Sequence, residues 1–218
     1  MERIPETECM DCPEEAREYA AMDNSEPNRA FVETLEIFGM REGELLDLGT
    51  GPADIPILLA ERFPEVRITA IDMSLEMLKI ARLRIAEAGL SQRVRLMPGD
   101  AKSLPFADGL FEGVFSNTIL HHVADPFAFL REAARVCSRN GKILIRDLMR
   151  PADEEELDRL VGLHAVGATG KQRKLLADSL RAAYTPAELA RIAEEAGLAG
   201  ARIEKSSDRH LTLYWVHP

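Results

Sequence analysis

From residue 44 onward, the pattern of apolar and polar positions divides the chain into alternating strands and helices. Five short apolar, β-rich runs predict strands, and they span 44–48, 66–71, 93–97, 110–116 and 141–148. The amphipathic stretches that predict crossover helices lie between them, at 54–63, 74–88 and 125–138. Strands that alternate with helices in this way form βαβ units and a mostly parallel sheet.

After Pro151 the alternation of strands and helices gives way to two charged helical segments, which indicates an insertion. The segments 153–165 and 171–183 are strongly helical and charged, and the glycine-containing stretch 166–170 separates them. The sequence therefore predicts an inserted helical hairpin over 151–183.

Residues 185–216 predict a helix and two strands, and residues 1–43 predict a separate N-terminal segment. Thr185-Pro186-Ala187-Glu188 is a capping box with proline at the first helical position, and Gly197 ends the helix that it starts. The alternating runs 201–206 and 210–216 predict two antiparallel strands joined by a tight turn. Residues 1–43 predict an N-terminal arm plus one helix at 26–38, which leaves 44–218 as the main domain.

Length and charge restrict the class of protein. The chain has 218 residues, 46% of them hydrophobic and 29% charged, which suits one α/β domain with an insertion. Its longest apolar run, 55–60, is too short to span a bilayer, and the N-terminus predicts no secretory or transit signal. A formal net charge of −10 disfavours nucleic acid and anionic membranes as partners. We expect a cytoplasmic protein that acts on a small molecule.

The three cysteines, Cys9, Cys12 and Cys137, indicate free thiols rather than a disulfide framework. Cys9-Met-Asp-Cys12 has the spacing of half a zinc site, but no second Cys-x-x-Cys or histidine pair completes it. The sequence therefore predicts no metal site, and the pair is interpreted as part of a mobile arm.

The strongest motif is a glycine-rich turn between the first strand and the helix after it, over 44–56. Glycine lets the backbone approach a ligand and adopt positive φ, and the helix N-terminus offers N–H groups to an anion. Gly49 and Gly51 fit a Gly-x-Gly-x-Gly spacing in which Ala53 replaces the third glycine. In the dinucleotide-binding spacing Asp54 would occupy that third place, where it would repel a pyrophosphate. A plain tight turn is the alternative.

Acidic residues fall at the carboxyl ends of three successive predicted strands. Asp72 follows the second strand, 21 residues after Gly51, where an acidic residue binds a ribose diol in nucleotide-binding folds. Its alternative role is to cap the helix that starts near Ser74. Asp100 follows the third strand. Ligands bind at these ends of open α/β sheets, so the acids predict a nucleotide-like ligand there.

Seven segments form a pattern that extends over most of the chain, and they are Leu46-Asp-Leu-Gly-Thr-Gly51, Ile71-Asp-Met73, Gly99-Asp-Ala101, Leu104-Pro-Phe106, Phe115-Ser-Asn-Thr-Ile-Leu-His-His122, Tyr184-Thr-Pro-Ala-Glu-Leu189 and Ala196-Gly-Leu198. Through these segments, over roughly residues 30–217, the sequence resembles the class I S-adenosylmethionine-dependent methyltransferases, and most of all the branch that contains the ubiquinone and menaquinone C-methyltransferases. The resemblance implies a Rossmann-like α/β fold whose seven-stranded, mostly parallel sheet ends in an antiparallel hairpin, with 151–183 as a helical lid.

The resemblance also implies which residues bind the cofactor, S-adenosylmethionine. The departure from the family pattern, Ala53, adds only a methyl group to the turn. The methionine part would contact Asp47 and the backbone of Gly49, Thr50 and Gly51, and the ribose would contact Asp72. The adenine would contact Met73, Asp100 and Ala101, and the reacting methyl end would lie beside Ser116 and Asn117.

Candidate catalytic residues lie near the end of the fourth strand and before the capped helix. His121 and His122 follow that strand, and histidine suits proton removal near neutral pH. Alternatively, one packs on the next helix and the other caps it. In the family's layout Tyr184 flanks the cleft, and a half-buried structural tyrosine is the other interpretation. Asp147, with Arg146, orients a polar substrate or forms an internal ion pair.

These observations predict an enzyme that moves a methyl group from S-adenosylmethionine to a small molecule by in-line displacement. One alternative is a protein that binds S-adenosylmethionine for regulation, or binds a modified cofactor, without methyl transfer. A nicotinamide-dependent dehydrogenase is disfavoured by Asp54 and by the terminal hairpin. The helical hairpin is either a lid over the cleft or the face of a homodimer.

Overall fold

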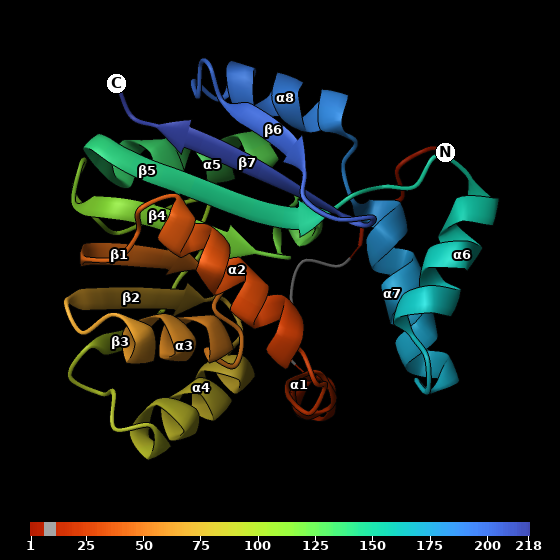
Figure 1. Cartoon of the computed structure of the whole chain (residues 1–218), viewed down its shortest axis with the longest axis horizontal. Coiled ribbons are helices and arrows are strands. Elements are labelled where there is room, and N and C mark those ends of the chain that lie inside the picture. The colour runs from red at the N-terminus through yellow and green to blue at the C-terminus, as the bar shows by residue number, and fades with distance from the viewer. Residues whose placement is uncertain (7–11) are drawn as a thin grey trace.

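A seven-stranded sheet forms the centre of the molecule in the computed structural model, which describes residues 1–6 and 12–218 (Figure 1). The strand order is β3-β2-β1-β4-β5-β7-β6. The strands are β1 (Gly43–Leu48), β2 (Val66–Asp72), β3 (Val94–Pro98), β4 (Phe111–Asn117), β5 (Cys137–Leu148), β6 (Arg202–Lys205) and β7 (His210–Val216).

Strands β1 to β5 are parallel, whereas β7 runs antiparallel to both β5 and β6. The register pairs Leu148 at the end of β5 with His210 at the start of β7. All five parallel strands therefore end at one edge of the sheet. The predicted α/β fold, with its C-terminal antiparallel hairpin, is confirmed.

Helices cover both faces of the sheet (Figure 1). Apolar residues of α2, α3 and α4 form one core with β1, β2 and β3, and those of α5 and α8 form the other with β4, β5 and β7. Burial on both faces explains the apolar runs Leu45–Leu46 in β1 and Ile143–Ile145 in β5. The helices that flank the sheet are α2 (Ser25–Ile37), α3 (Asp54–Arg62), α4 (Leu75–Glu87), α5 (Pro126–Val136) and α8 (Pro186–Glu195).

Local capping fixes where several helices begin. The hydroxyl of Thr185 accepts a hydrogen bond from the backbone N–H of Glu188, and the Glu188 carboxylate accepts one from the N–H of Thr185 at 2.8 Å. The capping box read from the sequence is thus present at the start of α8. Asp125 caps α5 through its own carboxylate, which accepts from the N–H of Ala128 at 2.9 Å.

The inserted hairpin consists of α6 (Glu154–His164) and α7 (Gly170–Ala182), and it stands beyond the carboxyl ends of the parallel strands (Figure 1). Its apolar residues pack together and onto Leu148, the last residue of β5. Helix α7 also contacts the 3-10 helix η1 (Leu120–His122).

Apart from shifts of one or two residues at element ends, one helix and one strand boundary differ from the sequence prediction. The N-terminal arm contains a helix, α1 (Pro13–Ala20), that the sparse apolar residues of this stretch did not predict. Strand β5 begins at Cys137 rather than at residue 141, because its register against β4 shifts between Phe111 and Gly113 and accommodates a bulge. Within the described part of the chain, no helix is long and apolar enough to cross a membrane.

Candidate functional site

The glycine-rich turn lies at the carboxyl edge of the sheet, between β1 and α3. Gly49, Gly51 and Ala53 all have positive φ, at 75°, 53° and 65°. A Cβ on Gly49 would lie 2.6 Å from the side chain of Ile119, so only glycine fits between the turn and the loop after β4. Ala53 keeps the left-handed conformation that suits glycine, which agrees with its expected role as a substitute.

Asp72 holds this turn against the end of β2. Its carboxylate accepts hydrogen bonds from the backbone N–H of Gly51 at 2.7 Å and from that of Ser74 at 2.8 Å. Burial raises the pKa of Asp72, and these hydrogen bonds oppose the rise. The alternative role of Asp72 was to cap the next helix. The side-chain cap of α4 is instead Ser74, whose hydroxyl accepts a hydrogen bond from the N–H of Met77. Asp72 thus connects the two strand ends that a nucleotide would meet.

Asp47, near the end of β1, is 3% exposed. Burial raises its pKa to about 7, with nearby Asp72 adding to the rise and the hydroxyl of Thr50 opposing it. An acidic group that titrates near neutrality at a strand end is typical of ligand sites. The structure therefore brings together Asp47, Thr50, Gly51 and Asp72.

The candidate adenine residues lie at the ends of β2 and β3. The Met73 side chain is 43% exposed, and Ala101 is buried. The carboxylate of Asp100 accepts from the backbone N–H of Lys102 at 2.9 Å and lies 3.1 Å from its ammonium group. The backbone N–H of Gly99 donates to Asp72 O at 3.0 Å, which joins these two strand ends.

The two candidates at the end of β4 already have protein partners. The hydroxyl of buried Ser116 donates to Leu48 O at 2.7 Å. The side-chain oxygen of Asn117 accepts from Arg146 at 2.7 Å. Arg146 also stacks 4.5 Å from the ring centre of Phe31, and burial lowers its pKa to about 10.

Helix α1 lies over the glycine-rich turn. A Cβ on Gly51 would be 4.0 Å from the ring of Tyr19, and burial together with Asp54 and Asp72 raises the pKa of that tyrosine. The guanidinium of Arg84 forms an ion pair with Asp54 and donates to Ala20 O at 2.6 Å. Arg84 thereby fixes the end of α1 beside the turn.

A second group of polar side chains surrounds η1, on the β4–β5 side of the same edge. His121 is 1% exposed, and its Nδ1 lies 2.6 Å from the buried carboxylate of Asp147. The backbone N–H of His121 donates to the same carboxylate, also at 2.6 Å. His122 Nδ1 lies 3.1 Å from Glu6, in the N-terminal segment. Asp147 thus forms an internal pair, with His121 rather than with Arg146, which binds Asn117.

Tyr184 is connected to this group through Arg3. The ring of Tyr184 is 6% exposed and lies 4.2 Å from the guanidinium carbon of Arg3. Arg3 also donates to the backbone carbonyl of His121 at 3.0 Å. The three candidate catalytic residues His121, His122 and Tyr184 are thus neighbours at the carboxyl edge, beside α7.

Sequence reasoning missed the contribution of the first six residues. Glu6 belongs to a segment whose backbone is bound to the hairpin, since the N–H of Ile4 donates to Arg181 O at 3.1 Å. No local pattern could reveal this contact, because its partners are far apart in the sequence. Cys9 lies outside the described residues, and Cys12 is exposed with its thiol 3.1 Å from Glu14.

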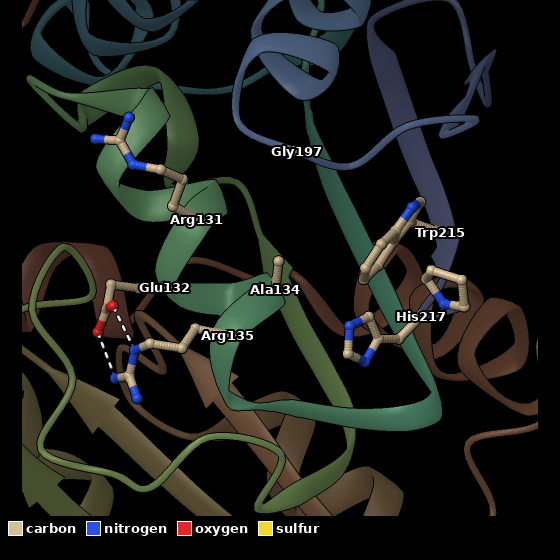
Figure 2. A pocket seen from close by; sticks show the side chains of 8 residues that line it. Arg131, Glu132, Ala134, Arg135, Gly197, Trp215 and His217 are labelled. Carbon is tan, nitrogen blue, oxygen red and sulfur yellow. Dashed lines mark hydrogen bonds and ion pairs between the residues drawn. The ribbon is translucent and has the colours of Figure 1, made fainter.

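A shallow hollow of about 530 Å³ lies elsewhere, between α5, the end of α8 and the end of β7 (Figure 2). Trp215 and His217 line it, together with the ion pair of Glu132 and Arg135 at 2.7 Å. Val216 pairs with Lys142 near the amino-terminal part of β5, so this hollow lies at the edge opposite the acidic strand ends. It contains none of the candidate site residues.

Comparisons with known proteins identify relatives of this chain. A methyltransferase-domain family model matches residues 46–145. The ubiquinone/menaquinone biosynthesis C-methyltransferase of Desulfotalea psychrophila is 37% identical over 110 residues, which cover 50% of this chain and 43% of that protein. The demethylmenaquinone methyltransferase of Roseiflexus castenholzii is 32% identical over 164 residues, covering 71% of this chain and 67% of that protein.

Solved structures share the fold. A methyltransferase from Aquifex aeolicus superposes with a TM-score of 0.70 at 21% identity, covering 95% of this chain and 99% of that chain. Phosphoethanolamine N-methyltransferase 2 of Haemonchus contortus, solved with S-adenosylmethionine, gives 0.70 at 18% identity, covering 93% of this chain and 56% of that one. The extent and identity of the Roseiflexus match show that the chain belongs to the class I S-adenosylmethionine-dependent methyltransferases.

Proposed function

We propose that the protein transfers the methyl group of S-adenosylmethionine to a small-molecule acceptor. The observation that carries this proposal is the carboxylate of Asp72, which binds the N–H of Gly51 and joins the glycine turn to the end of β2. The family relationship supports the same cofactor. The acidic surface and free thiols support a cytoplasmic location.

The residues of the carboxyl edge fit this cofactor. The close approach at Gly49 leaves backbone, rather than side chain, at the ligand face of the turn. The charged form of Asp47 suits an ammonium group, Asp72 suits a ribose diol, and exposed Met73 offers an apolar surface to an adenine ring. When bound, S-adenosylmethionine supplies an electrophilic methyl group on a sulfonium.

The chain's own contribution is to align the acceptor and exclude water. Such positioning is worth roughly 7 to 11 kcal/mol in well-oriented reactions. The acceptor side is the group around η1, where α7 covers His121 and His122. For an acceptor that arrives protonated, proton removal at these imidazoles or at Tyr184 stays a prediction.

The function is tested by following thermal unfolding with S-adenosylmethionine and with NAD in parallel. A ligand at 100 times its dissociation constant adds about 2.7 kcal/mol to the free energy of unfolding. We expect S-adenosylmethionine to raise the melting temperature and NAD to leave it unchanged. Mass spectrometry of the acceptor then separates methyl transfer from binding alone, because a purely regulatory protein leaves the acceptor's mass unchanged.

Asp72→Ala is expected to weaken the binding of S-adenosylhomocysteine by about 1.5 to 3 kcal/mol, because charge-assisted hydrogen bonds to two hydroxyls are lost. Isothermal titration calorimetry measures the effect. Asp108→Ala is the matched control, since Asp108 is an exposed aspartate before β4 at the opposite edge. Equal affinities of folded Asp72→Ala and wild type would contradict the assignment of Asp72.

The pKa of Asp47 predicts a pH dependence of cofactor binding. Because that pKa is raised to about 7, the carboxyl is mostly protonated at pH 6 and gains its charge as the pH rises. An ionised Asp47 attracts the cofactor's ammonium group, so affinity should increase about tenfold from pH 6 to pH 7.5. In Asp47→Asn, calorimetry should show weaker binding without this increase. The same slope in both proteins would assign the titration to another group.

A further inference from the structure

Three potential metal ligands converge near η1, at the acceptor side of the carboxyl edge. One oxygen of Glu6, Oε2, lies 3.1 Å from Nδ1 of His122 and 3.8 Å from Nε2 of His121. All three ligand atoms lie within 4.8 Å of one another. The two imidazole rings lie 4.0 Å apart between centres, so both face the same carboxylate.

His121 is buried between two carboxylates. Its Nδ1 lies 2.6 Å from the carboxylate of Asp147. Its Nε2 lies 3.8 Å from Oε2 of Glu6, a distance too long for a hydrogen bond. Nε2 of His121 and Oε2 of Glu6 therefore face one another across a gap that suits a metal ion bound to both.

The contacts around the cluster match the surroundings of metal ligands. A histidine that binds a metal usually donates its other N–H to a carboxylate, as His121 does to Asp147. The hydroxyl of Ser179, in α7, donates to both oxygens of Glu6, at 3.1 and 3.3 Å. Glu6 is therefore oriented by the hairpin, and the two histidines by the end of the sheet.

The separations between the ligand atoms suit a transition metal. Bonds of about 2.0 to 2.2 Å from zinc to nitrogen and oxygen place neighbouring ligand atoms about 3 to 3.6 Å apart. The separations of 3.1 and 3.8 Å need only small adjustments to meet this range. Two imidazoles with one carboxylate suit zinc, iron(II) or manganese better than calcium or magnesium, which prefer oxygen ligands.

We propose that Glu6, His121 and His122 bind one divalent transition-metal ion. Three protein ligands leave coordination positions open, as in catalytic metal sites. On the proposed function, an anionic oxygen of the acceptor occupies an open position, and the imidazoles then act as ligands rather than as bases. Binding of the metal itself does not depend on methyl transfer.

The test is calorimetric titration of the metal-free, full-length protein with Zn²⁺, without cofactor or acceptor. Cys9→Ser and Cys12→Ser are introduced as a background, so that these thiols contribute no ligands. We expect one ion bound per chain, and His122→Ala or Glu6→Gln to weaken binding by roughly a hundredfold or more. Mutating residues that only hydrogen-bond to a metal ligand typically lowers metal affinity about 10- to 100-fold, and loss of a ligand itself should cost at least as much.

His164→Ala is the matched control. His164 pairs with Asp208 at 2.7 Å, and its side chain is 23% exposed, as is that of His122. This variant should bind Zn²⁺ like the background protein, and circular dichroism checks that all variants fold. The proposal is overturned if the background protein shows no saturable binding, or if His122→Ala and Glu6→Gln bind as tightly as His164→Ala. Either result leaves cofactor binding and methyl transfer untouched.

Discussion

Asp147→Ala is expected to lower the free energy of unfolding by about 3 to 5 kcal/mol, because it breaks a buried pair and leaves its partner unsatisfied. The carboxylate accepts from the backbone N–H and Nδ1 of His121, at 2.6 Å each, and from the N–H of Leu148 at 2.7 Å. All three donors would remain buried without a partner. Urea unfolding, with the slope checked for constancy, measures the loss.

A second aspartate–histidine pair supplies the control for this prediction. Asp208 lies 2.7 Å from His164, but the side chain of Asp208 is 36% exposed. Asp208→Ala should cost no more than about 1 kcal/mol, as is usual for exposed pairs. Losses of equal size in the two variants would show that burial of the Asp147 pair does not stabilise η1.

Replacing residues 153–182 with a short Gly/Ser linker is expected to abolish methyl transfer, whereas the affinity for S-adenosylhomocysteine changes by less than about tenfold, or 1.4 kcal/mol. The hairpin supplies Ser179 to Glu6 and packs α7 on η1, but it provides none of the predicted cofactor residues. Its loss opens the acceptor side to water. Calorimetry measures cofactor binding, and release of S-adenosylhomocysteine with an acceptor that the wild type methylates measures turnover.

The other interpretation of the hairpin, a dimerisation face, needs its own control. Leu163 and Val166 are 54% and 81% exposed on the hairpin, so changing both to serine disturbs a dimer face but leaves the inner face of the lid intact. We expect this double variant to keep its activity and its mass in light scattering. Full activity and an unchanged oligomeric state in the linker protein would contradict the lid hypothesis.

The sheet was predictable because its signals are local. Strands buried on both faces read as apolar runs, and the Thr185 capping box and the positive-φ turn at Gly49 and Gly51 are written in consecutive residues. The start of β5 was misplaced because Asn140 and Gly141 resemble a turn between elements, whereas they form part of a bulge within a strand.

Some parts of the site could not be predicted from the sequence because they depend on contacts between distant segments. Helix α1 has few apolar residues, and its end is fixed by Arg84, more than 60 positions away. Its local signals are Pro13 at the first position and Arg17 in the last turn. Glu6 reaches His122 because the N-terminal segment pairs with α7, which no periodicity reveals. The partner of His121, Asp147, lies on the next strand of the sheet.

The central claim is that the cofactor binds where β1, β2 and β3 end, and a crystal structure of the protein with S-adenosylhomocysteine tests it most directly. We expect the ribose hydroxyls on the carboxylate of Asp72, the amino-acid part on the Gly49–Gly51 turn near Asp47, and the sulfur towards Asn117 and η1. The ligand bound instead in the hollow beside Trp215 and His217 (Figure 2), or adenine and ribose making no contact with Asp72, would contradict it.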